Sequence, residues 1–140
     1  MRVVVDTNVL VGAGFRPDSA AGWIVRGVLE GRFRMLWTDE IRDEVETVVG
    51  SIPPLSSAKL MGLFRAKDRT DPPPSEDRLD WIPDPADRKF AALTRDEGAT
   101  LVSNDRHLLE GRSIAGFEIL TSFEFWRRWS QATGSTRVTR

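Results

Sequence analysis

Two acidic residues directly follow short apolar segments, and both positions are suited to binding a hard cation. Residues 2–5 (RVVV) lead into Asp6-Thr7-Asn8, and residues 100–102 (TLV) lead into Ser103-Asn104-Asp105. Apolar runs of this kind predict buried parallel strands, and open α/β sheets bind ligands beyond the carboxyl ends of their strands. Two carboxylates at such ends supply the oxygen ligands that Mg²⁺ prefers. An Asp after a strand also commonly caps a helix, so a purely structural role remains open for either acid.

Glu44 is a third candidate, from a helix expected to begin after Thr38. It lies three residues after Ile41 and four before Val48, so it borders the apolar stripe of that helix. An acid in this position either reaches water or points into a cleft. We expect Glu44 to join the two strand-end acids, with solvation as the alternative.

The segment Asp84-Pro85-Ala86-Asp87 provides the fourth candidate. Proline favours the first position of a helix, which makes Asp84 the N-cap and places Asp87 in the first turn, where the helix dipole favours an acid. Asp87 also precedes Phe90 and Thr94 by three and seven residues, on a line that faces inward. We therefore expect a site role for Asp87 and a capping or supporting role for Asp84.

The elements that must position these acids alternate between strands and helices. This alternation predicts an α/β fold with a central parallel sheet. Strands are expected at the N-terminus, at 33–37, at 79–82, from Thr100 and at 117–120. One helix is expected from a Ser19 cap to Gly31 and another from the Thr38 cap, and further helices are expected at 58–67, 85–97 and 122–129. Loops are expected at 12–18, 51–57 and 68–77, and a loop or turn is expected after Asp105.

Length and composition favour one domain and exclude several kinds of site. The chain has 140 residues, 20 basic and 21 acidic side chains, one His and no Cys. Thiolate metal sites, thiol nucleophiles and histidine-rich sites are therefore excluded, and we expect His107 on the surface. Residues 1–130 are expected to form the domain and 131–140 a polar, frayed tail. No apolar run is long enough to cross a membrane and no signal-peptide pattern is present, so we expect a cytoplasmic protein.

The four acids in their order resemble the PIN-domain nucleases, most closely the bacterial and archaeal branch that includes VapC-like toxins. The matching features are Asp6-Thr7-Asn8, Glu44 in a helix after a strand, Asp87 before Phe90-Ala91-Ala92, and Ser103-Asn104-Asp105. The resemblance implies a PIN-like three-layer α/β/α fold in which Asp6, Glu44, Asp87 and Asp105 are catalytic and bind Mg²⁺ or Mn²⁺. It also implies that Thr7, Asn8, Ser103 and Asn104 orient the carboxylates or a metal-bound water. Ser103 replaces the threonine frequent in the family and keeps the hydroxyl group.

The same resemblance implies metal-dependent hydrolysis of single-stranded RNA by direct attack of water. In a VapC-like toxin it further implies a homodimer and a small antitoxin protein as partner. Four basic residues close to the motifs are candidates for holding RNA phosphates: Arg16, Arg88, Lys89 and Arg106. A non-catalytic RNA- or protein-binding α/β module is the alternative. A phosphatase with a strand-end Asp nucleophile is disfavoured, because position 8 carries Asn8 where that chemistry often needs a second acid.

Overall fold

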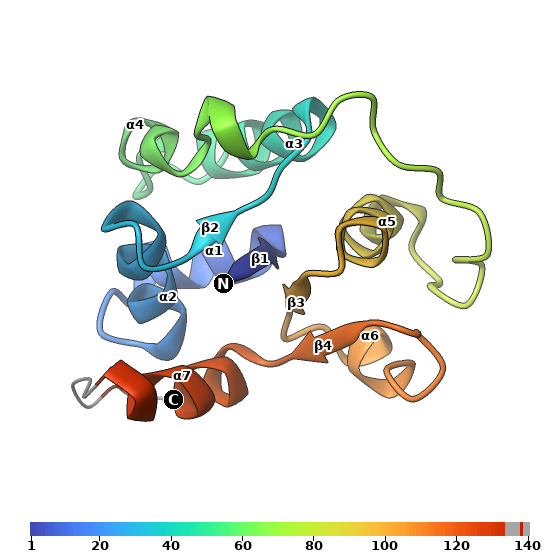
Figure 1. Cartoon of the computed structure of the whole chain (residues 1–140). Coiled ribbons are helices and arrows are strands. Elements are labelled where there is room, and N and C mark those ends of the chain that lie inside the picture. The colour runs from blue at the N-terminus through green and yellow to red at the C-terminus, as the bar shows by residue number, and fades with distance from the viewer. Residues whose placement is uncertain (134–137, 139–140) are drawn as a thin grey trace.

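Four short parallel strands form the centre of the molecule (Figure 1). They are β1 (Arg2–Val5), β2 (Arg34–Met35), β3 (Thr100–Val102) and β4 (Glu118–Leu120), and their order in the sheet is β2-β1-β3-β4. The computed structural model describes residues 1–133 and residue 138. Val3, Val4, Leu101 and Val102 in the two middle strands have no exposed surface, as expected for strands covered on both faces. The predicted α/β class with a parallel sheet is confirmed.

The register of the middle strands brings the two polar motifs together. Val5 of β1 pairs with Val102 of β3, so Asp6 and Ser103 follow at neighbouring strand ends. The Asp6 N–H group donates to the carbonyl oxygen of Val102 at 3.0 Å, which extends the pairing by one residue. Asp6 and the Ser103 motif therefore leave the sheet at the same edge, as the sequence predicted.

Helices cover both faces of the sheet. In Figure 1, α3 (Asp39–Gly50) and α5 (Arg88–Glu97) lie on one side of the strands, while α2 (Ala20–Leu29) and α7 (Ser122–Thr133) lie on the other. This arrangement confirms the predicted three-layer architecture. The remaining helical segments are α1 (Thr7–Phe15), α4 (Ser57–Leu60), α6 (Arg106–Glu110) and the 3₁₀ turns η1 (Met61–Leu63), η2 (Ala66–Asp68) and η3 (Pro85–Asp87).

Three predicted helix boundaries are confirmed by their capping interactions. The Ser19 hydroxyl accepts a hydrogen bond from the Gly22 N–H group at 3.2 Å, and the Thr38 hydroxyl accepts one from Ile41 at 3.3 Å. Each satisfies an N–H group that has no partner within the helix. The third boundary is the C-terminus of α5, where Gly98 adopts the left-handed conformation at φ 61° and ends the helix, as expected for glycine.

The prediction of a loop over residues 12–18 was wrong for its first part, because α1 continues to Phe15. The two glycines in this helix lower its intrinsic helix propensity, which is why the sequence favoured a loop there. The tertiary structure compensates, since Asp6 caps α1 and the side chains of Val9, Leu10 and Ala13 are buried. At Gly14 the chain packs closely on Leu55: a β-carbon there would lie 2.7 Å from Leu55 Cδ2, so the end of that side chain would have to move.

Other local predictions also need correction. The helix expected at 58–67 is divided into α4, η1 and η2, and the strand expected at 79–82 is a turn. Leu79 and Ile82 are nevertheless almost completely buried, so their apolar character reflects packing rather than a strand.

The strand expected at 33–37 is limited to β2, and α6 occupies the expected loop after Asp105. Helix α7 extends to Thr133, into the expected tail, most of which lies outside the described residues.

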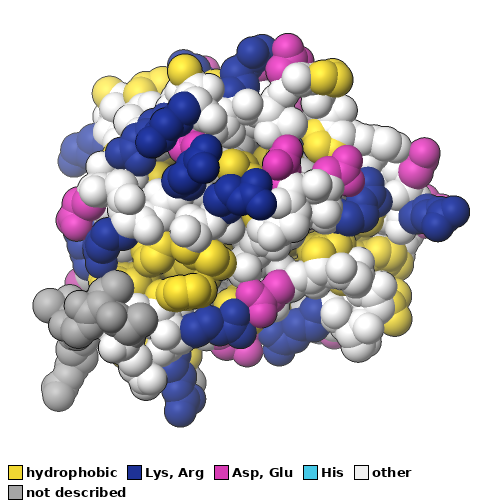
Figure 2. Space-filling model, in the orientation of Figure 1, with side chains coloured by type: hydrophobic (Ala, Val, Ile, Leu, Met, Phe, Trp, Pro, Cys, Tyr) yellow, Lys and Arg dark blue, Asp and Glu magenta, His cyan; other side chains and the backbone are white. Residues whose placement is uncertain are grey.

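The surface carries charges of both signs. On the face drawn in Figure 2, basic and acidic side chains are interspersed rather than separated. Several of them form ion pairs, among them Arg34 with Asp68 at 2.8 Å and Arg69 with Asp39 at 2.6 Å. Within the described part of the chain, no helix combines the length and the apolar character needed to span a bilayer.

Candidate active site

Asp6 is the most buried of the four acids, with 4 % of its surface exposed. Its Oδ1 accepts the N–H group of Asn8 at 3.4 Å and so caps α1. Its Oδ2 accepts the hydroxyl of Ser103 at 2.7 Å, and the Ser103 oxygen in turn accepts the N–H group of Asp105 at 3.1 Å. The Ser103 hydroxyl therefore connects the first acid with the backbone of the last one.

Asp105 caps a helix and also has a carboxylate oxygen free for a ligand, so it fits both of the roles that the sequence left open. Its Oδ2 accepts the Leu108 N–H group at 3.0 Å and caps α6. No hydrogen bond from the described residues reaches its Oδ1. Capping uses one carboxylate oxygen, so the other remains available to a ligand.

Glu44 extends from α3 and is held by two side chains. The hydroxyl of Thr7 donates to its Oε2, and the ammonium of Lys89 donates to its Oε1 at 2.6 Å. Thr7 is the residue after Asp6 and is 3 % exposed, so it attaches Glu44 directly to the end of β1. Glu44 therefore contacts the strand end and α5, and a quarter of its side chain remains exposed.

Asp84 precedes η3 and Asp87 is its last residue, as their spacing around Pro85 predicted. Asp84 Oδ1 accepts the N–H group of Ala86 at 2.9 Å, which confirms its capping role. Asp87 lies immediately before α5, and its carboxylate makes no hydrogen bond to any described residue. Asp87 is thus held in place by its backbone while its carboxylate stays free.

The pKa values indicate that these acids share one region. Burial raises the pKa of Asp6, against the lowering effect of the Ser103 and Asn8 hydrogen bonds, and the charges of Glu44 and Asp105 raise it further. Burial also raises the pKa of Asp87 from 3.8 to about 6, with additional repulsion from Asp6, Asp84, Asp105 and Glu44. Like charges raise one another's pKa when they are near, so Asp6, Glu44, Asp87 and Asp105 lie in one region of the molecule.

The donor set suits a hard divalent cation. It consists only of carboxylate and hydroxyl oxygens, and Asp87 and Asp105 each present an oxygen without a hydrogen bond to the described residues. No three acidic or histidine side chains among the described residues are close enough to form a finished metal site. The chemistry of the residues therefore fits Mg²⁺ or Mn²⁺, and a bound ion would draw the carboxylates closer together.

The predicted supporting residues fall into two groups. Thr7 and Ser103 contact site acids directly, as described above. Asn104 lies away from them, since its side-chain oxygen accepts the Ser122 N–H group at 3.0 Å and so holds the start of α7. The Asn8 side chain is exposed, and only its backbone contacts Asp6.

The four basic candidates also differ in their surroundings. Arg88 donates from two guanidinium nitrogens to the carbonyl oxygen of Ile82, at 3.1 and 2.8 Å, and so fixes the chain before η3. Arg106 is highly exposed and forms an ion pair with Glu110 at 3.4 Å. Arg16 is exposed at the end of α1. Lys89, in contrast, donates a hydrogen bond to Glu44, and no local pattern signals this contact, because 45 positions separate the two residues.

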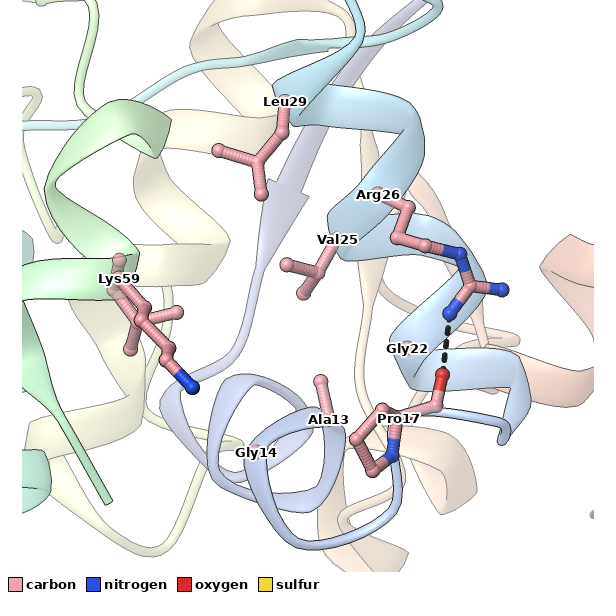
Figure 3. A pocket seen from close by; sticks show the side chains of 9 residues that line it. Ala13, Gly14, Pro17, Gly22, Val25, Arg26, Leu29 and Lys59 are labelled. Carbon is pink, nitrogen blue, oxygen red and sulfur yellow. Dashed lines mark hydrogen bonds between the residues drawn. The ribbon is translucent and has the colours of Figure 1, made fainter.

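One hollow in the described structure is separate from the acids (Figure 3). It has a volume of about 310 Å³ and lies between α1, α2 and α4. Its walls are largely apolar, and at its edge Arg26 donates a hydrogen bond to the carbonyl oxygen of Pro17. None of the four acids lines this hollow.

Fold and site together define an α/β protein with an acidic cluster at the carboxyl edge of a parallel sheet. The family model of the PIN domain matches residues 2–107 of this chain. The chain belongs to the PIN-domain family, whose members are generally nucleases. A search among curated proteins found no match to this chain.

Proposed function

We propose that the protein is a ribonuclease that uses Mg²⁺ or Mn²⁺ to hydrolyse phosphodiester bonds of single-stranded RNA. Asp6, Glu44, Asp87 and Asp105 would hold the metal ion. The observation that carries this proposal is the mutual electrostatic effect of these acids at one edge of the sheet, in a chain of a nuclease family. Carboxylates crowded in this way are stabilised by a cation, and nucleic acid hydrolysis is a common use of such a cation.

Each residue contributes a distinct part of the proposed site. A bound divalent ion would lower the pKa of an attacking water and neutralise negative charge on the phosphate. Ser103 keeps Asp6 oriented through its 2.7 Å hydrogen bond, and Thr7 orients Glu44. Asp87 and Asp105 supply oxygens that are free of hydrogen bonds to the described residues. Arg106, adjacent to Asp105, and Arg16 are the basic side chains that we propose for phosphate contacts.

A narrower proposal concerns the biological setting. The order of the four acids resembles VapC-like toxins, so we propose that the protein is a cytoplasmic toxin, dimeric and inhibited by a small antitoxin protein. Expression alone should then arrest growth, and co-expression of the proposed antitoxin should restore it. Normal growth on expression of an enzyme that is active in vitro would indicate a housekeeping nuclease instead.

Calorimetry with Mn²⁺ and cleavage of a mixed-sequence single-stranded RNA test the core proposal. Asp6→Asn should remove metal binding and lower cleavage at least 100-fold, because it replaces a metal-binding carboxylate with a neutral amide. Asp96→Asn is the matched control, since Asp96 is exposed on α5 and pairs with Arg95. It should behave as wild type. A wild-type protein that neither binds Mn²⁺ nor cleaves RNA would support the non-catalytic module.

The nature of the substrate needs its own comparison. A single-stranded DNA of the same sequence should be cleaved more slowly than the RNA. Equal cleavage of both would contradict RNA specificity while leaving the metal-dependent nuclease intact.

A further inference from the structure

The ammonium of Lys89 lies inside the acidic site rather than in solvent. It donates to Glu44 Oε1 and to the carbonyl oxygen of Ala86, each at 2.6 Å, and only 15 % of its side chain is exposed. It also lies 5.1 Å from the centre of the Phe90 ring. A lysine held by three contacts in a partly buried position is an organised part of the site.

Lys89 already donates to Oε1 of Glu44, one of the two oxygens through which this carboxylate would bind a metal ion. Thr7 already donates to Oε2, so both oxygens of this carboxylate have donors. A divalent ion close to Oε1 would also experience repulsion from the ammonium charge. This agrees with the absence, among the described residues, of three acids in position to bind a metal.

We propose that Lys89 is an internal competitor of the divalent cation for Glu44. Without metal, its ammonium neutralises part of the acidic cluster. Metal binding requires the ammonium to leave Oε1, so Lys89 lowers the affinity of the site for the ion. The proposal rests on the proposed metal-dependent function and adds a role that the sequence did not assign, because Lys89 was expected to contact RNA phosphate.

The neighbouring basic residues do not share this position. Arg88 is bonded to the Ile82 carbonyl oxygen, and Arg106 pairs with Glu110 on the exposed side of α6. In the part of the chain that the structure describes, the Lys89 ammonium donates a hydrogen bond to one of the four acids, Glu44. The competition is therefore specific to one residue and can be removed by one substitution.

Titration calorimetry with Mn²⁺ on the full chain tests the competition. Lys89→Met should bind Mn²⁺ roughly tenfold more tightly than wild type, the repulsion expected for a unit charge about 5 Å from a divalent ion in a water-like medium. Lys89→Gln, which can still donate to Ala86, should show a similar gain. Arg128→Met removes the same charge from an exposed position on α7, where Arg128 pairs with Glu118, and should change affinity less than twofold.

A double-substitution cycle identifies Glu44 as the point of competition. In a Glu44→Gln background, adding Lys89→Met should raise Mn²⁺ affinity clearly less than it does in the wild-type background, because the contested carboxylate is gone and only the through-space repulsion by the ammonium remains. Circular dichroism in EDTA verifies the folding of each variant. Wild-type affinity in both Lys89 variants, or weaker binding, would overturn the competitor role while leaving the metal site intact. Absence of Mn²⁺ binding in wild type and variants alike would overturn the proposed function together with this inference.

Discussion

Asp87→Asn should stabilise the metal-free protein at neutral pH, although it removes a proposed site residue. In the folded protein the pKa of Asp87 is raised to about 6, whereas the unfolded value is near 3.8. Between pH 3.8 and pH 6, Asp87 is therefore largely protonated in the folded protein and largely ionised in the unfolded one. The free energy of unfolding therefore decreases as the pH rises through this window, and the full cost is present above pH 6.

The size of this effect follows from the shift. About two pKa units correspond to roughly 3 kcal/mol as an upper limit. Asp87 is partly exposed and precedes the N-terminus of α5, where an acid is favourable. Solvent screening and the helix dipole reduce the expected gain of the Asn variant to about 1 kcal/mol at pH 7.5. At pH 4.5 about a third of the gain should remain, because most unfolded-state carboxylates are still ionised there.

Urea denaturation in EDTA, followed by tryptophan fluorescence at both pH values, measures this difference. Asp96→Asn, on the exposed side of the same helix, is the control and should stay within about 0.5 kcal/mol of wild type at either pH. In Mn²⁺ the order should reverse, because the ion stabilises the wild-type site. A variant that is less stable than wild type in EDTA at pH 7.5, or a gain that is independent of pH, would refute the electrostatic reasoning.

Three further substitutions test the framework of the site, each by chemical denaturation. Ser103→Ala leaves a buried oxygen of Asp6 without its donor and should cost about 1–3 kcal/mol, whereas Ser103→Thr should retain most of the stability. Thr38→Ala removes the cap of α3, the helix that carries Glu44, and should cost about 1 kcal/mol. Gly98→Ala should cost roughly 1 kcal/mol because the residue keeps a φ of 61°. Wild-type stability in any of these variants would contradict the corresponding interaction.

The sequence alone predicts the parts of the structure that depend on local chemistry. The buried strands β1 and β3 follow from their apolar runs, and the starts of α2 and α3 follow from Ser19 and Thr38. The carboxyl ends of parallel strands share one edge of the sheet, so the neighbourhood of Asp6 and Asp105 was also predictable. Where propensity and packing conflict, the prediction failed: α1 forms despite Gly12 and Gly14 because the interior buries one side of it.

Only the tertiary structure decided how the site is held together. The Lys89–Glu44 contact and the Thr7–Glu44 hydrogen bond join segments 45 and 37 positions apart, and no local pattern encodes such distances. The Ser103–Asp6 hydrogen bond likewise depends on the pairing of β1 with β3. Residue types and their order thus determined which acids are candidates. Long-range packing decided which of their oxygens are already engaged, because hydrogen bonding and desolvation depend on neighbours in space rather than in sequence.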